Sequence, residues 1–459
     1  MFRNYFKIAY RQLLKHKLFS ALNIFGLATS MSVCLLLIMI LADQYGYDEF
    51  HKNKDRLFRV TSARAEPSIP LTQPTLATTS LELKNYLQEG YPFVSSTTRL
   101  AQTGGVFRKD NQPMYADNVG YYVDASFLDM FSFGWTAGNA ATALTQPYSI
   151  VLTQEAADKF FPEGNALGQV LNFDELGAFT ITGLMPDPPI RSHIYFDYLI
   201  SWATVTAMQE AERRDRHIYD ETNISRGLVY ILLEEDADRT QLDEALAAQS
   251  AAYSERSSGQ QYRFFSQAML DVMPSPGMGT IGNEIGTGTP SIVLYFLMTL
   301  GFIIMLAACF NYMNLSVARS LRRSKEIGIR KVIGAGRKDV IFQLLSEAVL
   351  IAFLSLLVAV ALLEFLIPAF YGLDPFVRQI FYLERTPQLY LLFFVFSLVI
   401  GLFAGLFPAI NISTFRPIEA IQQLSNAKLF SKVGLRKALV TAQFALSLIF
   451  ILVVIIVLR

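Results

Sequence analysis

Few residue patterns in this sequence place reactive side chains close enough to act together. Asp48-Glu49-Phe50-His51 brings two carboxylates and an imidazole into one short stretch that could bind a cation. We favour a local structural cluster, because His16, His193 and His217 are scattered and share no metal-ligand spacing. Neither a Gly-x-Ser-x-Gly nucleophile elbow nor a Gly-x4-Gly-Lys-Ser/Thr phosphate loop occurs. The sequence therefore predicts no catalytic, cofactor-binding or metal site, and a chain that is not an enzyme by itself.

The most informative pattern is a basic segment, residues 318–340. It holds Lys and Arg around the apolar Ile327, Ile329, Val332 and Ile333, and it is broken at Gly334-Ala-Gly336. These residues predict a short basic helix that ends at the glycines. Such a helix can lie flat on anionic lipid or dock into a groove of a partner protein, and composition alone leaves both open.

Long apolar runs dominate the rest of the sequence and must position that segment. Apolar residues make up 52% of the 459 residues and charged residues 17%, against about 25% charged in a soluble domain. A bilayer core about 30 Å thick needs roughly 20 apolar residues in a helix, and five runs meet that length. They predict an α-helical integral membrane protein of about five spans, with a large α+β domain between spans 1 and 2.

The charged residues that flank these runs divide the chain. We expect an amphipathic helix at 1–17, span 1 at 18–42, the large domain at 43–290, span 2 at 291–318, the basic loop at 319–339, span 3 at 340–367, a short outer loop at 368–388, span 4 at 389–412, a linker at 413–437 and span 5 at 438–458. The first helix can lie on the membrane, because its apolar residues share one face and its cations the other. It can equally be the basic flank of span 1.

The flanking charges also orient the spans. Residues 1–17 hold five cations and no acid, 319–339 hold eight Lys/Arg against two acids, and 413–437 hold five against one. The positive-inside rule places all three, and with them the amino terminus, in the cytoplasm. The first run is longer than a signal-peptide core of about 7–15 residues, so we expect it to remain as a span rather than to be cleaved.

The domain at 43–290 then lies outside. It holds 18 Lys/Arg against 32 Asp/Glu, a net charge of −14, although the whole chain balances 39 against 39. A balanced total removes any general argument for nucleic-acid binding. The β-rich run 228–233 and the helical pattern 240–252 indicate a mixed α/β body, and Gly/Pro breaks near 104 and 186 could bound an inserted subdomain.

Two carboxylates, Glu347 and Glu364, interrupt the apolar interior of span 3. Carboxylates in a membrane are costly and usually face a protein partner or water. We favour the interpretation that both lie near the ends of the span and reach the interface, since Glu364 comes four residues before Pro368.

The basic segment resembles the signature of the FtsX-like permeases, the MacB-like membrane subunits of macrolide-exporter and lipoprotein-release ABC transporters. The matching motifs near the spans are Glu326-Ile-Gly-Ile-Arg-Lys331, Gly334-Ala-Gly336, Gln343, Glu347-Ala348, Phe407-Pro-Ala409 and Pro417-Ile-Glu-Ala420. Those of the external domain, similar to a MacB-like periplasmic core, are Tyr47–Asn53, Asp55–Val60, Asp124–Phe133, Ser149–Thr153, Ser192-His193 and Phe196-Asp197. The resemblance covers nearly the whole chain.

The resemblance implies a division of labour in the inner (plasma) membrane. A separate cytoplasmic ATPase dimer would carry ATP and Mg, while this chain would bind no cofactor. That dimer would engage a coupling loop formed by Arg322, Arg323, Lys325, Glu326, Ile327, Gly328, Ile329, Arg330, Lys331, Gly334, Ala335 and Gly336. Its closure would move spans 2 and 3 and, through them, the periplasmic domain, which is mechanotransmission for export or extraction of a substrate.

Further partners follow from the same resemblance. They are membrane lipid, a periplasmic adaptor or outer-membrane protein, and a second permease half in a dimer or pseudo-dimer.

Span 5 departs from the four-span members, and its basic lead echoes the start of the chain, so we expect the first half of a duplicated permease. The alternative function is a non-transporting signal transmitter that regulates or senses a cell-envelope protein. An inert anchored ectodomain is disfavoured, because it needs no basic, glycine-broken loop.

The predicted orientation can be tested with single cysteines. Asn111→Cys should react with an impermeant thiol reagent in intact spheroplasts, because residues 43–290 are expected outside. Ser324→Cys should stay unlabelled until the membrane is permeabilised. The unsubstituted chain, whose Cys34 and Cys309 lie in apolar runs, is the control. The opposite labelling pattern would reverse the assigned topology.

Overall fold

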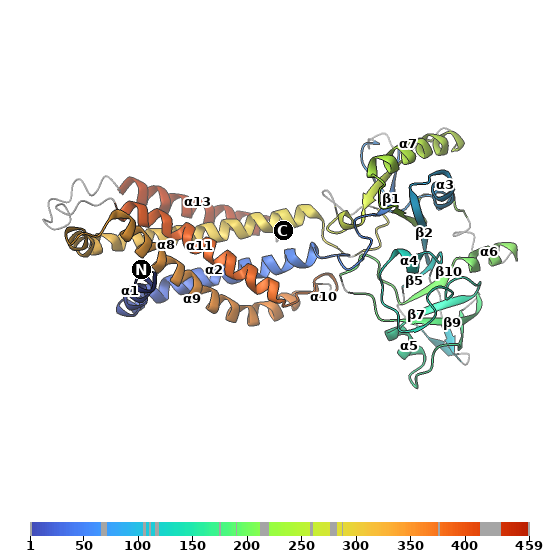
Figure 1. Cartoon of the computed structure of the whole chain (residues 1–459), viewed down its shortest axis with the longest axis horizontal. Coiled ribbons are helices and arrows are strands. Elements are labelled where there is room, and N and C mark those ends of the chain that lie inside the picture. The colour runs from blue at the N-terminus through green and yellow to red at the C-terminus, as the bar shows by residue number, and fades with distance from the viewer. Residues whose placement is uncertain are drawn as a thin grey trace. The chain divides into compact units, whose positions relative to one another are not determined.

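A computed structural model describes most of the chain (Figure 1). The described residues are 2–65, 71–103, 107–109, 112–114, 119–173, 176–189, 191–211, 220–257, 260–275, 282–286, 288–374, 377–413 and 433–457. They fall into two compact units, residues 1–43 with 293–459, called here the helical unit, and residues 44–292, called the α/β unit.

Long helices make up the helical unit. They are α1 (Phe2–Lys15), α2 (Lys17–Gln44), α8 (Ser291–Val332), α9 (Arg337–Tyr371), α10 (Val377–Ile380), α11 (Pro387–Ser413) and α13 (Val433–Val457). Among the described residues, four stretches are long and apolar enough to cross a membrane: α2, Ser291–Ala318 of α8, α9 and α11. The predicted span at 438–458 falls on α13, where the apolar stretch Val440–Leu452 is shorter.

The basic loop expected at 319–339 is not a separate short helix. Instead α8 continues without a break from the predicted second span to Val332. A helix that is already formed adds further residues at little cost, and a single glycine such as Gly328 costs only about 1 kcal/mol. The helix stops where Gly334 takes φ +108°.

The first helix packs against the helical unit. Ala9 and Leu13 are buried and belong to the same core cluster as Ile351 of α9, while Lys7 and Arg11 are exposed. The apolar face of α1 is thus covered at least in part by protein, where the sequence left only lipid or a simple flank as interpretations. The side chains of residues 2–6 lie outside the described part.

Small residues set the closest contact in the helical unit, between α9 and α11. A Cβ on Gly401 would lie 2.9 Å from the Cα of Val349, and Gly405 faces Ala348. Because lipid gives helices no hydrophobic drive to associate, close approach at small residues supplies the packing energy. α13 contacts α8 through an amide hydrogen bond from Asn314 to Gln443 at 3.4 Å.

The α/β unit is built on one sheet. Its strands are β1 (Leu57–Arg64), β2 (Val94–Thr103), β3 (Phe107–Lys109), β4 (Gln112–Met114), β5 (Gly120–Val123), β6 (Ala137–Gly138), β7 (Ser149–Thr153), β8 (Val170–Phe173), β9 (Gly177–Met185), β10 (Tyr198–Ser201), β11 (Gly227–Leu233) and β12 (Tyr262–Ala268). Its helices are α3 (Leu83–Gly90), α4 (Phe127–Met130), α5 (Gln154–Phe160), α6 (Ala203–Glu210) and α7 (Arg239–Arg256), with a 3-10 turn at Met269–Asp271. The predicted strand at 228–233 and helix at 240–252 are confirmed.

Within the described residues the strand order is β12-β1-β11-β2-β5-β10-β7-β9-β8-β3-β4, with β6 paired to β9. The β10–β5 and β7–β9 pairs are parallel and the others are antiparallel. The strands between β2 and β11 in sequence form one side of the sheet, and β2 joins β5 at Leu100↔Val123. The breaks near 104 and 186 therefore do not bound a subdomain with a sheet of its own.

Two apolar cores cover the two faces of this sheet. Helices α3, α5, α6 and α7 contribute to one core, through residues such as Leu87, Phe160 and Leu246. The other core contains α4 and an aromatic group around Phe131 and Phe196. This second face also carries the polar residues described below.

Candidate functional site

The turn between α8 and α9 carries most of the predicted coupling residues. Gly334 takes a left-handed conformation that residues with a Cβ rarely adopt. Its N–H donates to the Lys331 carbonyl at 3.1 Å, and the Ala335 N–H donates to the Arg330 carbonyl at 3.0 Å. These two bonds form a Schellman motif, which satisfies carbonyls at the end of a helix. The glycines therefore end α8 and reverse the chain into α9.

Side chains at the turn connect α8 to α9 and α11. Arg330 Nη1 donates to Gln343 Oε1 of α9 at 2.6 Å, and Lys331 Nζ donates to the carbonyl of Ser413, the last residue of α11, at 2.6 Å. Arg337 Nε also reaches Ser413 Oγ at 3.3 Å. Burial, with the charge of Arg337 acting in the same direction, lowers the pKa of Lys331. The three helix ends are thus held together as one corner.

Apolar side chains on this corner remain exposed. Ile329, Val332 and Ile333 are 45%, 65% and 80% exposed. They stand beside the exposed cations Arg337 and Lys338. A patch of this composition suits a groove with an apolar floor and an acidic rim.

The remaining predicted coupling residues lie on the last turns of α8. Gly328 is buried, whereas the side chains of residues 319–327 lie outside the described part. That group comprises Arg322, Arg323, Lys325, Glu326 and Ile327. The Pro417–Ala420 motif also lies outside the described residues.

The two membrane carboxylates have different surroundings. Glu364 forms a two-point ion pair with Arg385, at 2.8 and 3.1 Å, and both side chains are about half exposed. Glu347 is only 5% exposed. Its burial differs from the expectation that it reaches the interface, because Glu347 and the neighbouring Ala348 lie on the side of α9 that packs inside the helical unit.

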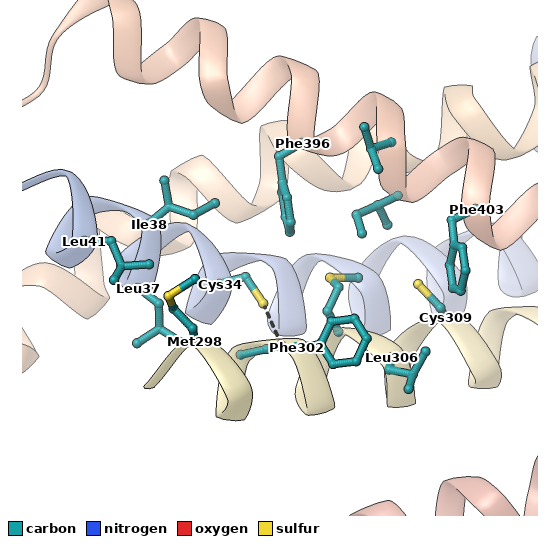
Figure 2. A pocket seen from close by; sticks show the side chains of 14 residues that line it. Cys34, Leu37, Ile38, Leu41, Met298, Phe302, Leu306, Cys309, Phe396 and Phe403 are labelled. Carbon is teal, nitrogen blue, oxygen red and sulfur yellow. Dashed lines mark hydrogen bonds between the residues drawn. The ribbon is translucent and has the colours of Figure 1, made fainter. Parts of the chain in front are cut away.

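A cavity of about 470 Å³ lies between α2, α8 and α11 (Figure 2). Leu37 and Cys34 line one wall, Met305 and Cys309 a second, and Phe396 of α11 the third. The lining residues are apolar apart from the two thiols. A cavity of this kind can hold an apolar group, but it offers a polar cargo no hydrogen-bond partners.

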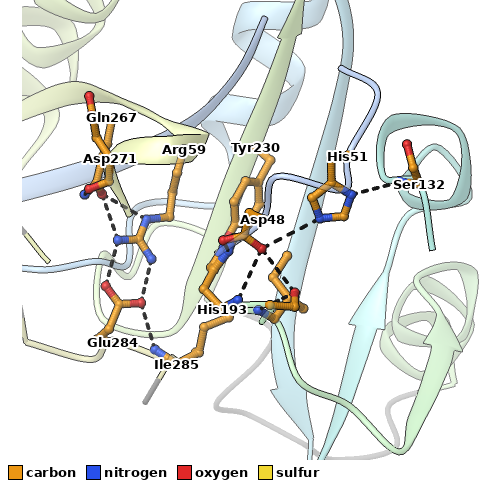
Figure 3. A network of polar contacts seen from close by, with 12 residues as sticks. Asp48, His51, Arg59, Ser132, His193, Tyr230, Gln267, Asp271, Glu284 and Ile285 are labelled. Carbon is orange, nitrogen blue, oxygen red and sulfur yellow. Dashed lines mark hydrogen bonds and ion pairs between the residues drawn. The ribbon is translucent and has the colours of Figure 1, made fainter. Parts of the chain in front are cut away.

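The α/β unit contains a buried polar network centred on Asp48 (Figure 3). Asp48 has φ +60°, a conformation that aspartate tolerates better than most residues. Its carboxylate accepts from Ser192 Oγ at 3.2 Å, from the His193 N–H at 3.2 Å, and lies 2.7 Å from His193 Nδ1. His193 Nε2 lies 2.7 Å from the Tyr230 hydroxyl. All four side chains are buried.

His51 completes the group around Asp48. Its Nδ1 accepts the Ser132 N–H at 3.0 Å, so its Nε2 carries the proton in the neutral ring. That Nε2 lies 3.8 Å from Asp48 Oδ1 and has no hydrogen-bond partner. Burial lowers the pKa of His51 to about 4, although the charge of Asp48 opposes this.

A second part of the network surrounds Arg59, which has no exposed side-chain surface. Its guanidinium donates to Glu284 Oε1 and Oε2 at 2.6 and 2.7 Å and to Gln267 Oε1 at 2.7 Å. Burial opposes both charges, but the hydrogen bonds between Arg59 and Glu284 outweigh it. They raise the pKa of Arg59 and lower that of Glu284. Both groups are therefore charged.

The stretch Asp48–His51 is thus held by contacts within the α/β unit. Among the described residues, no group of three or more His, Cys, Asp or Glu side chains could hold a metal ion. The sequence interpretation missed Arg59, Tyr230 and Glu284. The available signal was Arg59 itself, a single cation between apolar residues in a run that reads as a buried strand.

Two family sequence models match the chain. The MacB-like periplasmic core domain matches residues 20–249, half of the chain, and the FtsX-like permease C-terminal domain matches residues 298–417. The chain therefore belongs to the FtsX/MacB-like family of ABC transporter permeases, as its motifs indicated. It is a membrane protein with a MacB-like periplasmic domain.

Individual relatives share little sequence identity with this chain. The uncharacterized ABC transporter permease YvrN of Bacillus subtilis is 23% identical over 313 residues, 66% of this chain and 69% of YvrN. The macrolide export ATP-binding/permease protein MacB of Campylobacter jejuni (strain 81-176) is 24% identical over 431 residues, 91% of this chain but 61% of that protein. The crystallised periplasmic region of MacB from Actinobacillus actinomycetemcomitans is 12% identical, with a TM-score of 0.33, over 46% of this chain and 89% of that one. The chain thus spans less than two thirds of that MacB protein.

Stability of the α/β unit should depend on pH through His51. Because its pKa in the folded state lies near 4, below the ordinary 6.5, its neutral form stabilises the fold above pH 6.5. That contribution should be lost as the pH falls from 6.5 to 4, on the order of 3 kcal/mol in all. Both tryptophans, Trp135 and Trp202, lie in this unit, so their fluorescence follows its unfolding by denaturant in the full chain.

The matched variant is His51→Gln, which keeps an acceptor for the Ser132 N–H but does not titrate. It should be less stable than the wild type at pH 7 and lose less stability between pH 6.5 and 4. Equal losses in the two proteins would show that His51 is not the titrating group.

Proposed function

We propose that this permease transmits the motion of a cytoplasmic ATPase dimer to its periplasmic domain, and so drives export or extraction of a substrate. The observation that carries the proposal is the corner at the α8–α9 turn. There Arg330 and Lys331 join α8 to α9 and α11, and an exposed apolar patch faces outward. A force applied at that patch acts on three spans together.

The continuity of α8 supports the same mechanism. The helix runs from Ser291, beside the α/β unit in sequence, to Val332 at the corner. Its backbone hydrogen bonds make it stiff along its axis, so a displacement at one end is carried to the other. A helix broken between span and coupling segment would absorb part of that displacement.

The cavity in the helical unit bears on the cargo route. Since it offers apolar contacts and no polar lining beyond two thiols, a polar substrate has no favourable path there. We therefore place the work of the transporter on the periplasmic side of the membrane. The apolar lining of the cavity would suit only an apolar anchor of a cargo.

The partners and location belong to the same proposal. The chain would lie in the inner membrane with a cytoplasmic amino terminus, in a dimer or pseudo-dimer of permease halves in contact with lipid and with a periplasmic adaptor or outer-membrane protein. The MacB relatives are named ATP-binding/permease proteins, whereas the present sequence has no P-loop. ATP and Mg would therefore bind to an ATPase subunit outside this sequence.

The alternative class is a signal transmitter that moves nothing across the envelope. It would use the same corner, and it differs from a transporter in what happens to a substrate. A transporter should deplete a substrate from the membrane or periplasm in an ATP-dependent way. A transmitter should instead change the activity of a cell-envelope protein.

The coupling role can be tested at the exposed patch. Val332→Asp with Ile333→Asp should lower the amount of ABC ATPase that co-purifies at least tenfold, because burying such side chains is worth about 1.5–3 kcal/mol each. The ATPase is recognised by its P-loop peptides in mass spectrometry. In the wild-type complex, vanadate trapping should change amide hydrogen exchange in residues 44–292, and the double variant should lose that change.

Leu373→Asp is the matched control, since Leu373 is 75% exposed beyond the opposite end of α9. It should leave co-purification unchanged. Retention of the ATPase by the double variant would remove the corner as the docking site. An intact complex whose periplasmic exchange ignores vanadate would argue against mechanotransmission.

A further inference from the structure

The α/β unit connects to the spans through two segments of chain. One is 44–51, which follows α2, and the other is 282–292, which leads into α8. The Thr289 N–H donates to Gln44 Oε1 at 2.9 Å, and Tyr47 of the first segment shares a small apolar cluster with Met273. The second segment also passes close to Met273, where a Cβ on Gly286 or Gly288 would collide with the methionine side chain.

The register of the sheet places a row of polar side chains beside these segments. Arg59 of β1 is directly opposite Tyr230 of β11 on one side and Gln267 of β12 on the other. Directly opposed residues of antiparallel strands have Cβ atoms about 5 Å apart and project from the same face. That face is otherwise covered by the apolar core around Phe131.

The row is bonded at both ends to the connecting segments. Glu284, in segment 282–292, holds Arg59 through two hydrogen bonds. Asp48, in segment 44–51, holds His193, whose Nε2 lies 2.7 Å from the Tyr230 hydroxyl. Tyr230 is directly opposite Arg59 in the register, and the charge of Arg59 opposes the burial that raises the pKa of Tyr230. A continuous path therefore runs from Glu284 to Asp48 through buried groups.

We propose that this path, from Asp48 through His193, Tyr230 and Arg59 to Glu284, makes the two connecting segments a single mechanical element of the α/β unit. Each group is buried, so loss of any one leaves its neighbours without a partner away from water, which is costly. Tyr230 is the residue through which the two halves communicate. A role of this path in moving the domain rests on the proposed function, whereas the coupling between the two connecting segments does not.

The test is hydrogen exchange of the full chain in lipid nanodiscs without nucleotide. Glu284→Gln should raise the exchange rate of the amides in 45–51 about tenfold, because the path connects Glu284 to Asp48. Those amides include Asp48, bonded to the Arg191 carbonyl, and His51, bonded to the Asp48 carbonyl. Asp48→Asn is the reciprocal variant and should raise exchange in 282–292.

Tyr230→Phe is the deciding variant, because it removes one hydroxyl and keeps the ring. Alone it should raise exchange in 45–51, and in its presence Glu284→Gln should add no further rise there. Tyr198→Phe is the control: Tyr198 is equally buried in the same sheet, but its hydroxyl has no hydrogen-bond partner. It should change neither segment.

Exchange in β7 and β9 must stay at the wild-type rate, which separates local loosening from loss of the fold. The inference is overturned if Glu284→Gln affects only 282–292, or if its effect on 45–51 persists in Tyr230→Phe. In that second case the direct contacts between the segments, Gln44 with Thr289 and Tyr47 and Gly288 through Met273, are sufficient. Failure of the ATPase experiment would leave this result unaffected.

Discussion

The α/β unit depends on one buried ion pair. A guanidinium with no exposed surface is stable in a protein only when a carboxylate, itself fixed in place, pairs with it. Arg59 lies on the first strand, while Glu284 comes from the last segment before the chain enters α8. Breaking such a buried pair by removing one partner typically costs about 3–5 kcal/mol. The beginning and the end of the domain must therefore be in place together.

The helices of the helical unit are held together in a different way. Lipid rewards no burial of apolar side chains, so the spans approach each other at small residues such as Gly401 and Gly405. Charged groups appear mainly where helices end. Glu364 and Arg385 pair near the start of α11, and Arg330, Lys331 and Arg337 gather at its other end. The ends of α8, α9 and α11 are thus bonded to one another at the α8–α9 turn.

Features that depend on local sequence could be predicted, and those that depend on distant partners could not. Run length predicted the four helices that are long and apolar enough to cross a membrane, and Gly334 marked the end of α8, because each acts through its own backbone or through lipid. The uninterrupted course of α8 was missed, since basic residues suggested a loop although nothing in them stops a helix. The pairing of Arg59 with Glu284 joins residues 225 positions apart, and no pattern of spacing reveals it. The same holds for the ties of Lys331 and Arg337 to Ser413.

The width of the single sheet determines how far its outer strands would move in a rotation. Strand β1, next to one edge and bound to the chain that leads into α8, lies seven strand steps from β8 in the pairing order. At about 4.8 Å between neighbouring strands the separation is roughly 30 Å. A tilt of about 10° around β1 would then sweep the β8 side through roughly 5 Å, about the width of one strand. Under the proposed mechanotransmission, the sheet would act as a lever arm in which a small rotation near β1 becomes a larger displacement at β8.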